Sequence, residues 1–215
     1  AAVAILPAVI LSDSPCRIEN IPDISDVKTL TYILKEMGAR VEYLDLHTVE
    51  IDPRPIMTDI VSAEIARRIR ASYYFIGVLL GRCRNAVVPL PGGCNFGVRP
   101  IDQHLKGFVA LGCDYSLDNG TISVSAQNDL HGANIYLDVV TVGATMNIML
   151  AAVKARGLTV IENAAREPHI VDLANFLNTM GADIRGAGTD TIKIHGVQRL
   201  RGVTYSIIPD QIEAG

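Results

Sequence analysis

The segment IVDLANFLNTMGA, residues 170–182, has the pattern of an amphipathic helix that ends at a glycine. Counting back from Gly181, apolar side chains stand at positions −1, −4, −8 and −11, which lie on one face of a helix. Glycine is a common helix stop because it adopts the left-handed conformation without a Cβ clash. Positions −1, −4 and −11 are apolar again before Gly38 and Gly112. We therefore interpret the chain as three copies of one unit.

The three glycines are 74 and 69 residues apart, and similar segments surround each of them. Every copy contains an almost wholly apolar segment, a short β-rich segment, the amphipathic segment and two short alternating segments. The apolar segments cover residues 2–11, 71–80 and 144–153. A helix with almost no polar face is buried on all sides. The pattern predicts helix–strand–helix–strand–strand units, with the apolar helices in the centre and the sheets outside.

We predict a single α/β domain over residues 1–208, built from pseudo-symmetric units at about 1–59, 60–138 and 139–208. The alternative is a doubly wound parallel sheet, which needs long continuous apolar strands that the sequence lacks. Residues 209–215 are interpreted as a linker to a second domain outside this sequence. The start at Ala1, without a methionine, likewise suggests a piece of a longer protein.

Composition excludes several classes of protein. The chain has 215 residues, 49% of them hydrophobic, with 19 Lys and Arg against 23 Asp and Glu, for a net charge of −4. This balance excludes a disordered chain and gives no support for a nucleic-acid groove. The apolar run at 1–11 is too short to span a bilayer, which takes about 20 residues. The cysteines form no C-x-x-C pair, which argues against zinc and fits a reducing, cytoplasmic compartment.

The second copy departs from the other two. The distance from the strand before the amphipathic helix to the glycine is 20 residues in the first and third copies and 24 in the second. The extra residues fall within PGGCNFGVRPIDQH, 91–104, a glycine-rich segment that feeds a helix start, where free N–H groups favour an anion. At stripe position −8 this copy carries His104, where the others carry leucine. The second copy is therefore predicted to be the chemical one.

Cys94 is the strongest candidate for chemistry, because Arg99 and backbone donors would lower its pKa and make the thiol a usable acid, base or nucleophile. Arg70 and Arg99 are either surface arginines or a phosphate or carboxylate clamp. Asp102 either favours its helix N-terminus or holds a sugar or base. His104 is either a satisfied core histidine or a site residue. We expect the remaining cysteines to be small buried hydrophobes; they are Cys16, Cys83 and Cys113.

The third copy opens with VTVGAT, residues 140–145. Thr141 is either an ordinary N-cap or part of a second set of N–H donors for an anion. Residues 163–168 are expected only to connect a strand to a helix. Neither an H-E-x-x-H motif, a Walker loop nor a dinucleotide fingerprint is present in the sequence, so we predict neither a metal nor a cofactor.

At these segments the sequence resembles the UDP-N-acetylglucosamine 1-carboxyvinyltransferase family over essentially its whole length. The segments that carry the resemblance are PGGCNFGVRPIDQH (91–104), IRAS (69–72), TVGAT (141–145), IENAAREPHIVDLANFL (161–177) and IPDQIEAG (208–215). The resemblance implies two domains of similar build, each an inside-out α/β barrel of three βαβαββ-type units, with the site between them. This chain corresponds to the domain that carries the cysteine loop.

The resemblance also implies an activity: transfer of enolpyruvyl from phosphoenolpyruvate to the 3′-hydroxyl of UDP-N-acetylglucosamine with release of phosphate, the first committed step of peptidoglycan synthesis. Cys94 would protonate the phosphoenolpyruvate methylene, form a covalent adduct and be alkylated by fosfomycin. Substrate contacts are implied for Arg70, Arg99, Pro100, Ile101, Asp102, Gln103, Val139, Val140, Thr141, Val142 and Gly143. Two departures matter: the Lys-Asn pair usual just before Ala1 is not in the sequence, and Val139 replaces a common lysine.

Three other functions compete with this interpretation. A 5-enolpyruvylshikimate 3-phosphate synthase shares the architecture, but that family lacks the cysteine-bearing loop. A non-catalytic paralogue would bind the nucleotide-sugar without turning it over. An RNA-processing module is disfavoured by the acidic balance. Because half of the catalytic groups would come from the second domain, we predict that these 215 residues alone are inactive.

Overall fold

The computed structural model describes residues 1–91 and 101–209. The first unit consists of α1 (Ala2–Ala8), the 3₁₀ helix η1 (Val9–Leu11), β1 (Cys16–Glu19), α2 (Ser25–Glu36), β2 (Arg40–Asp45) and β3 (Thr48–Asp52). The second contains α3 (Ala63–Ala66), η2 (Arg70–Tyr73), α4 (Tyr74–Cys83), β4 (Asn85–Pro89), α5 (Asp102–Ala110), β5 (Asp114–Asp118) and β6 (Thr121–Ser125). The third contains α6 (Val142–Ala152), β8 (Leu158–Glu162), α7 (Pro168–Met180), β9 (Asp183–Arg185) and β10 (Thr191–His195), followed by β11 (Thr204–Ser206). It also takes in β7 (Asn134–Tyr136), which lies before the predicted unit boundary at 138 but pairs with β8.

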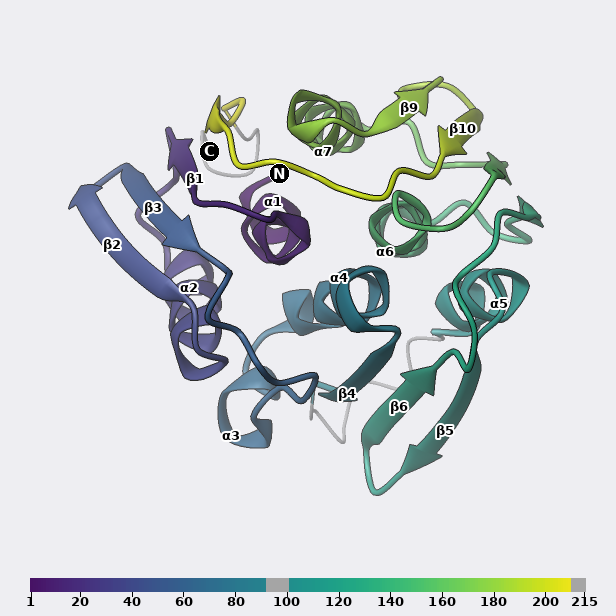
Figure 1. Ribbon diagram of the computed structural model, residues 1–215, viewed down its shortest axis with the longest axis horizontal. Coiled ribbons are helices and arrows are strands. Elements are labelled where there is room, and N and C mark those ends of the chain that lie inside the picture. Colours follow the sequence, from purple (N-terminus) through teal and green to yellow (C-terminus); the bar gives the residue numbers. More distant parts are fainter. Residues whose placement is uncertain (92–100, 210–215) are drawn as a thin grey trace.

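Helices occupy the centre of the molecule and sheets its outside, as the sequence predicts (Figure 1). The apolar helices α1, α4 and α6 lie innermost, with the amphipathic helices α2, α5 and α7 beside them. All nine side chains from Ala144 to Ala152 in α6 are buried. The predicted inside-out α/β fold is therefore confirmed, and its physical cause is the scarcity of polar residues on the inner helices.

Each of the three sheets also contains a parallel strand or bridge that the sequence did not predict, and we call it the leading strand. In the third unit β7 runs parallel to β8, and in the second an isolated parallel bridge joins Ile60 to Val87. In the first unit the leading strand is β11, from the other end of the chain, which pairs in parallel with β1 (Figure 1). This pairing closes the ring of three units.

The three glycines end their helices in the same way. Gly38, Gly112 and Gly181 have φ angles of 111°, 101° and 114°. In each copy the residue after the glycine donates its backbone N–H to a carbonyl five residues earlier, at 3.0 Å. These bonds are Ala39 to Leu34, Cys113 to Phe108 and Ala182 to Leu177. The helix stop predicted from the repeated step is confirmed.

A buried carboxylate holds the last strand in place. Asp172 of α7 is 2% exposed and accepts hydrogen bonds from the Tyr205 hydroxyl and, at 3.2 Å, from the Ile208 backbone N–H. Burial and this carboxylate raise the pKa of Tyr205, so its hydroxyl remains a donor. The chain is thus fixed to α7 as far as residue 208.

Candidate active site

Gln103 joins the start of α5 to the segment that leads into α6. Its buried side chain accepts from the Asp138 backbone N–H at 2.8 Å and donates to carboxylate oxygens of Asp138 and Asp102 at 3.3 Å each. Lys106 pairs with Asp138 at 2.9 Å, and hydrogen bonds from Lys106 and Gln103 lower the pKa of Asp138. Because its amide is fully engaged, Gln103 holds two predicted substrate-binding segments together.

The first turn of α6 is fixed by side-chain hydrogen bonds. Thr141 is its N-cap, accepting from the Ala144 N–H at 3.4 Å, so the capping role considered from the sequence is confirmed. The Thr145 hydroxyl donates to the Thr141 carbonyl at 2.7 Å and accepts from the Ala165 N–H at 3.1 Å. The helix start is therefore locked onto the loop that follows β8.

Two backbone donors remain at this helix start. Within residues 1–91 and 101–209, no group accepts a hydrogen bond from the N–H of Val142 or Gly143. The neighbouring side chains of Val139 and Val140 are 64% and 55% exposed, which is unusual for valine. The segment thus offers both N–H donors and exposed apolar side chains, as expected where a protein binds an anion that is linked to an uncharged group.

His104 faces the same helix start from α5. It is buried at 8% exposure, and its Nδ1 lies 3.0 Å from the Asn147 side-chain nitrogen. A Cβ added to Gly143 would lie 3.3 Å from Nε2 of His104. Burial lowers the pKa of His104 to about 4, so the ring is neutral near pH 7. One nitrogen is satisfied as in a core histidine, and the other is directed to the candidate site.

Arg70 is the first residue of η2. The last residue of η2 is Tyr73, and the centre of its ring lies 5.8 Å from the centre of the His104 ring. The side chain of Arg70 is exposed, and in the described part of the chain it forms no ion pair. Its charge partly offsets the burial that raises the pKa of Tyr74. Cys94, Arg99 and Pro100 lie outside the described residues, so their convergence with Arg70 stays a prediction.

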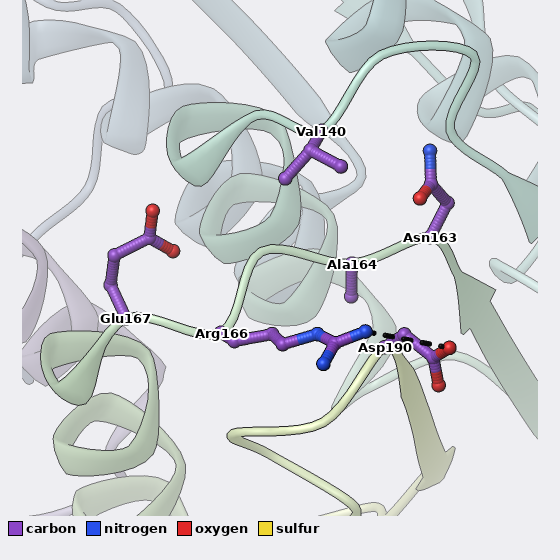
Figure 2. A pocket seen from close by; sticks show the side chains of 6 residues that line it. All are labelled: Val140, Asn163, Ala164, Arg166, Glu167 and Asp190. Atoms are coloured by element: carbon purple, nitrogen blue, oxygen red, sulfur yellow. Dashed lines mark ion pairs between the residues drawn. The ribbon is translucent and has the colours of Figure 1, made fainter.

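A cavity of about 360 Å³ adjoins the segment before α6 (Figure 2). Its lining comes from Val140, from the loop between β8 and α7 and from the turn before β10: Val140, Asn163, Ala164, Arg166, Glu167 and Asp190. Arg166 and Asp190 form an ion pair at 3.7 Å across it. Residues 163–168 thus do more than connect a strand to a helix, and the sequence does not predict this cavity because the residues that line it come from separate segments.

The cysteine expectation was correct for Cys16 and Cys113, which are buried. Burial raises the pKa of Cys113 to about 12, so this thiol is not a nucleophile at neutral pH. For Cys83 the expectation was wrong, since this residue is exposed. It lies in the last turn of α4, and its thiol donates to the Leu79 carbonyl at 3.2 Å.

Over residues 1–91 and 101–209, no three His, Cys, Asp or Glu side chains are grouped so that they could hold a metal ion. None of the helices in those ranges has the length and apolar character needed to cross a membrane.

Comparison with known sequences places the chain among enolpyruvyl transferases. It is 58% identical over its whole length to UDP-N-acetylglucosamine 1-carboxyvinyltransferase 3 of Caldanaerobacter subterraneus subsp. tengcongensis, of which it covers 51%. It is 57% identical to UDP-N-acetylglucosamine 1-carboxyvinyltransferase 2 of Clostridium acetobutylicum, again covering 51%. The chain thus spans about half the length of the curated relatives it matches. The resemblance stated from the sequence is confirmed.

Solved structures give the same picture for the fold. The enolpyruvyl transferase NikO from Streptomyces tendae matches 99% of the chain, and half of its own, with a TM-score of 0.85 and 26% identity. EPSP synthase from Acinetobacter baumannii matches 95% with a TM-score of 0.68 and 17% identity, which shows a shared fold. Residues 1–215 match the family described as EPSP synthase (3-phosphoshikimate 1-carboxyvinyltransferase). The chain therefore belongs to the EPSP synthase family of enolpyruvyl transferases.

Proposed function

We propose that the protein containing this chain transfers enolpyruvyl from phosphoenolpyruvate to the 3′-hydroxyl of UDP-N-acetylglucosamine and releases phosphate, the first committed step of peptidoglycan synthesis. Two relatives that bear the name of this activity are 57% and 58% identical over the whole chain. The EPSP synthase-like alternative rests on a 17% identical structure and a family-level match.

The observation that carries the proposal is that the first turns of α5 and α6 are held close together. Gln103 and Asp138 tie the beginning of α5 to the segment before α6, where the N–H groups of Val142 and Gly143 point to no acceptor among the described residues. Helix starts carry partial positive charge, so two of them favour a polyanion such as the diphosphate of a nucleotide-sugar. The neutral His104 adds a further polar group.

In this proposal the residues divide into three groups. Thr141, Val142 and Gly143 line the diphosphate with N–H groups, while Val139 and Val140 provide apolar contact. The nucleotide-sugar pocket is formed by Pro100, Ile101, Asp102 and Gln103. Arg70 and Arg99 clamp phosphate oxygens, and Cys94 acts on phosphoenolpyruvate.

The chemistry follows from the charges that develop. The thiol of Cys94 gives its proton to the methylene carbon of phosphoenolpyruvate, and the adjacent carbon gains oxocarbenium character. The sugar 3′-oxygen attacks that carbon and gives its proton to a base. The tetrahedral product then loses phosphate and a methyl proton, which restores the double bond. Fixed arginines and N–H groups stabilise the phosphate oxygens throughout, since preorganised donors need no reorganisation during the reaction.

The base for the sugar hydroxyl belongs, in this proposal, to a second domain that follows residues 209–215. The proposal is supported by the span of the chain, about half of its named relatives. The 215 residues alone are therefore expected to release no phosphate. The reaction is assigned to the cytoplasm, where phosphoenolpyruvate is produced and where free thiols stay reduced.

A non-catalytic paralogue that binds the nucleotide-sugar is the second candidate, and Cys94 separates the two. The test is treatment of the full-length protein with fosfomycin, whose epoxide carbon forms a bond to a reactive thiolate, followed by intact mass and peptide mapping. We expect one adduct, on Cys94. The exposed Cys83 is an internal control for non-specific alkylation. Absence of an adduct on Cys94, or equal labelling of Cys83, would reject the catalytic assignment.

A further inference from the structure

The side chain of Asn147 lies in the middle of α6 with no exposed surface, and its amide is fully hydrogen-bonded. Its Oδ1 accepts from the Gly77 backbone N–H at 2.8 Å. Its Nδ2 donates to the Tyr73 carbonyl at 2.8 Å and lies 3.0 Å from Nδ1 of His104. A backbone N–H only donates and a carbonyl only accepts, so these two partners fix which way the amide points.

This orientation determines where the His104 proton is. The second N–H of the Asn147 amide points at Nδ1 of His104, so Nδ1 must accept and carries no proton. In a neutral imidazole the single proton is then on Nε2. Of the described residues, Asp102 is the charged group that acts on His104 and would favour the cation, but burial outweighs it. The elements packed on the ring contribute uncharged groups: Tyr73 from η2, and Asn147 and Gly143 from α6.

The Nε2–H is directed at the start of α6. Gly143 leaves room for it, since a Cβ there would lie 3.3 Å from Nε2. Across the described residues, no group accepts a hydrogen bond from Nε2, and His104 as a whole is 8% exposed. The Nε2–H is therefore available to an acceptor oxygen of a ligand at this helix start. The Val142 and Gly143 N–H groups open at the same place.

We propose that Asn147 is a positioning residue that holds His104 as a neutral Nε2–H donor to an anionic oxygen bound at the start of α6. The inference rests on the proposed function, because the oxygen it invokes belongs to the diphosphate of the nucleotide-sugar. The other two copies carry Leu30 and Leu173 at the position of His104, and both are buried. Apolar packing is thus sufficient for the fold at this position, and the pair formed by His104 of the second copy and Asn147 of the third serves the ligand.

The test replaces Asn147 with aspartate in the full-length protein. A carboxylate accepts where the amide donated, so in the N147D variant the His104 proton moves to Nδ1 or the ring becomes an imidazolium. We expect affinity for UDP-N-acetylglucosamine to fall roughly tenfold near pH 8 and to recover as the pH is lowered toward 6, since loss of a hydrogen bond to a charged group is of this size. The affinity of the wild type should change little between pH 8 and pH 6, because a doubly esterified diphosphate does not titrate in this range.

Tyr205→Phe is the matched control, since it removes a buried hydrogen bond far along the chain from His104. Long-range ¹H–¹⁵N NMR of His104 reads the tautomer directly, and we expect an unprotonated Nδ1 in the wild type. If N147D binds with the same affinity and pH profile as Y205F, or if wild-type Nδ1 carries the proton, the inference is wrong while the proposed function stands. If the wild type does not bind UDP-N-acetylglucosamine at any pH, the proposed function fails and the inference fails with it.

Discussion

Replacing His104 with leucine removes a buried imidazole and installs the residue that the sibling copies carry at Leu30 and Leu173. Burial lowers the pKa of His104 from 6.5 to about 4 in the folded chain. In the unfolded chain the same histidine takes up a proton near pH 6.5, so the unfolded state gains protons first as the pH falls. The contribution of neutral His104 is therefore fully present above pH 6.5 and is lost as the pH falls toward 4.

The magnitude follows from the two pKa values. Each unit of difference is worth 1.36 kcal/mol, so the shift to about 4 corresponds to a loss of about 3 kcal/mol between neutral pH and pH 4. His104→Leu is expected to lack this loss. At neutral pH the variant is expected to be less stable by about 1 kcal/mol, because Asn147 keeps a buried N–H without an acceptor. The stability difference should shrink and then reverse on acidification.

The assay is urea unfolding of both chains, followed by circular dichroism, at steps between about pH 7.5 and pH 4.5. Carboxylates and the other histidines titrate in both proteins, so the difference between them isolates His104. This prediction is wrong if the stability difference is the same at both ends of this range. Such a result would mean that His104 takes up its proton equally well in the folded and unfolded states.

Two further changes test the packing. Tyr205→Phe removes the hydroxyl that donates to the buried Asp172, so it should lower the free energy of unfolding, measured by urea titration, by about 2 kcal/mol. The control Y115F changes an exposed tyrosine and should alter this free energy by less than about 0.5 kcal/mol. Equal effects of the two would contradict the role given to Asp172. Gly77→Ala places a Cβ 2.4 Å from two oxygens of Asn147, so it should lower the free energy of unfolding by about 3 kcal/mol even though alanine favours helices. A stabilised variant would show that α4 and α6 are not so closely packed.

The repeat was visible in the sequence because its signals are local. Gly38, Gly112 and Gly181 each follow an apolar stripe, and both features arise within about a dozen residues, so the helices and their ends could be predicted. His104 was marked as unusual because the other two copies supply a comparison. These inferences needed no knowledge of which distant segments meet.

The features that the sequence did not reveal depend on contacts between distant residues. Asn147 is a polar residue in an almost wholly apolar helix, but its partners are 43, 70 and 74 residues away, so the sequence does not show what it contacts. The pairing of β11 with β1 joins opposite ends of the chain. The cavity beside Val140 likewise needs three separate segments. Cys94 and Arg99 were marked by local composition, and their roles stay predictions.

We propose that this chain is half of an enzyme whose acceptor is UDP-N-acetylglucosamine. The most direct measurement is phosphate release by the full-length protein with phosphoenolpyruvate and one of two acceptors, UDP-N-acetylglucosamine or shikimate 3-phosphate. We predict release with the nucleotide-sugar, its loss in the Cys94→Ala variant, and no release with shikimate 3-phosphate. Release with shikimate 3-phosphate alone, or with neither acceptor, would show that the proposed activity is wrong.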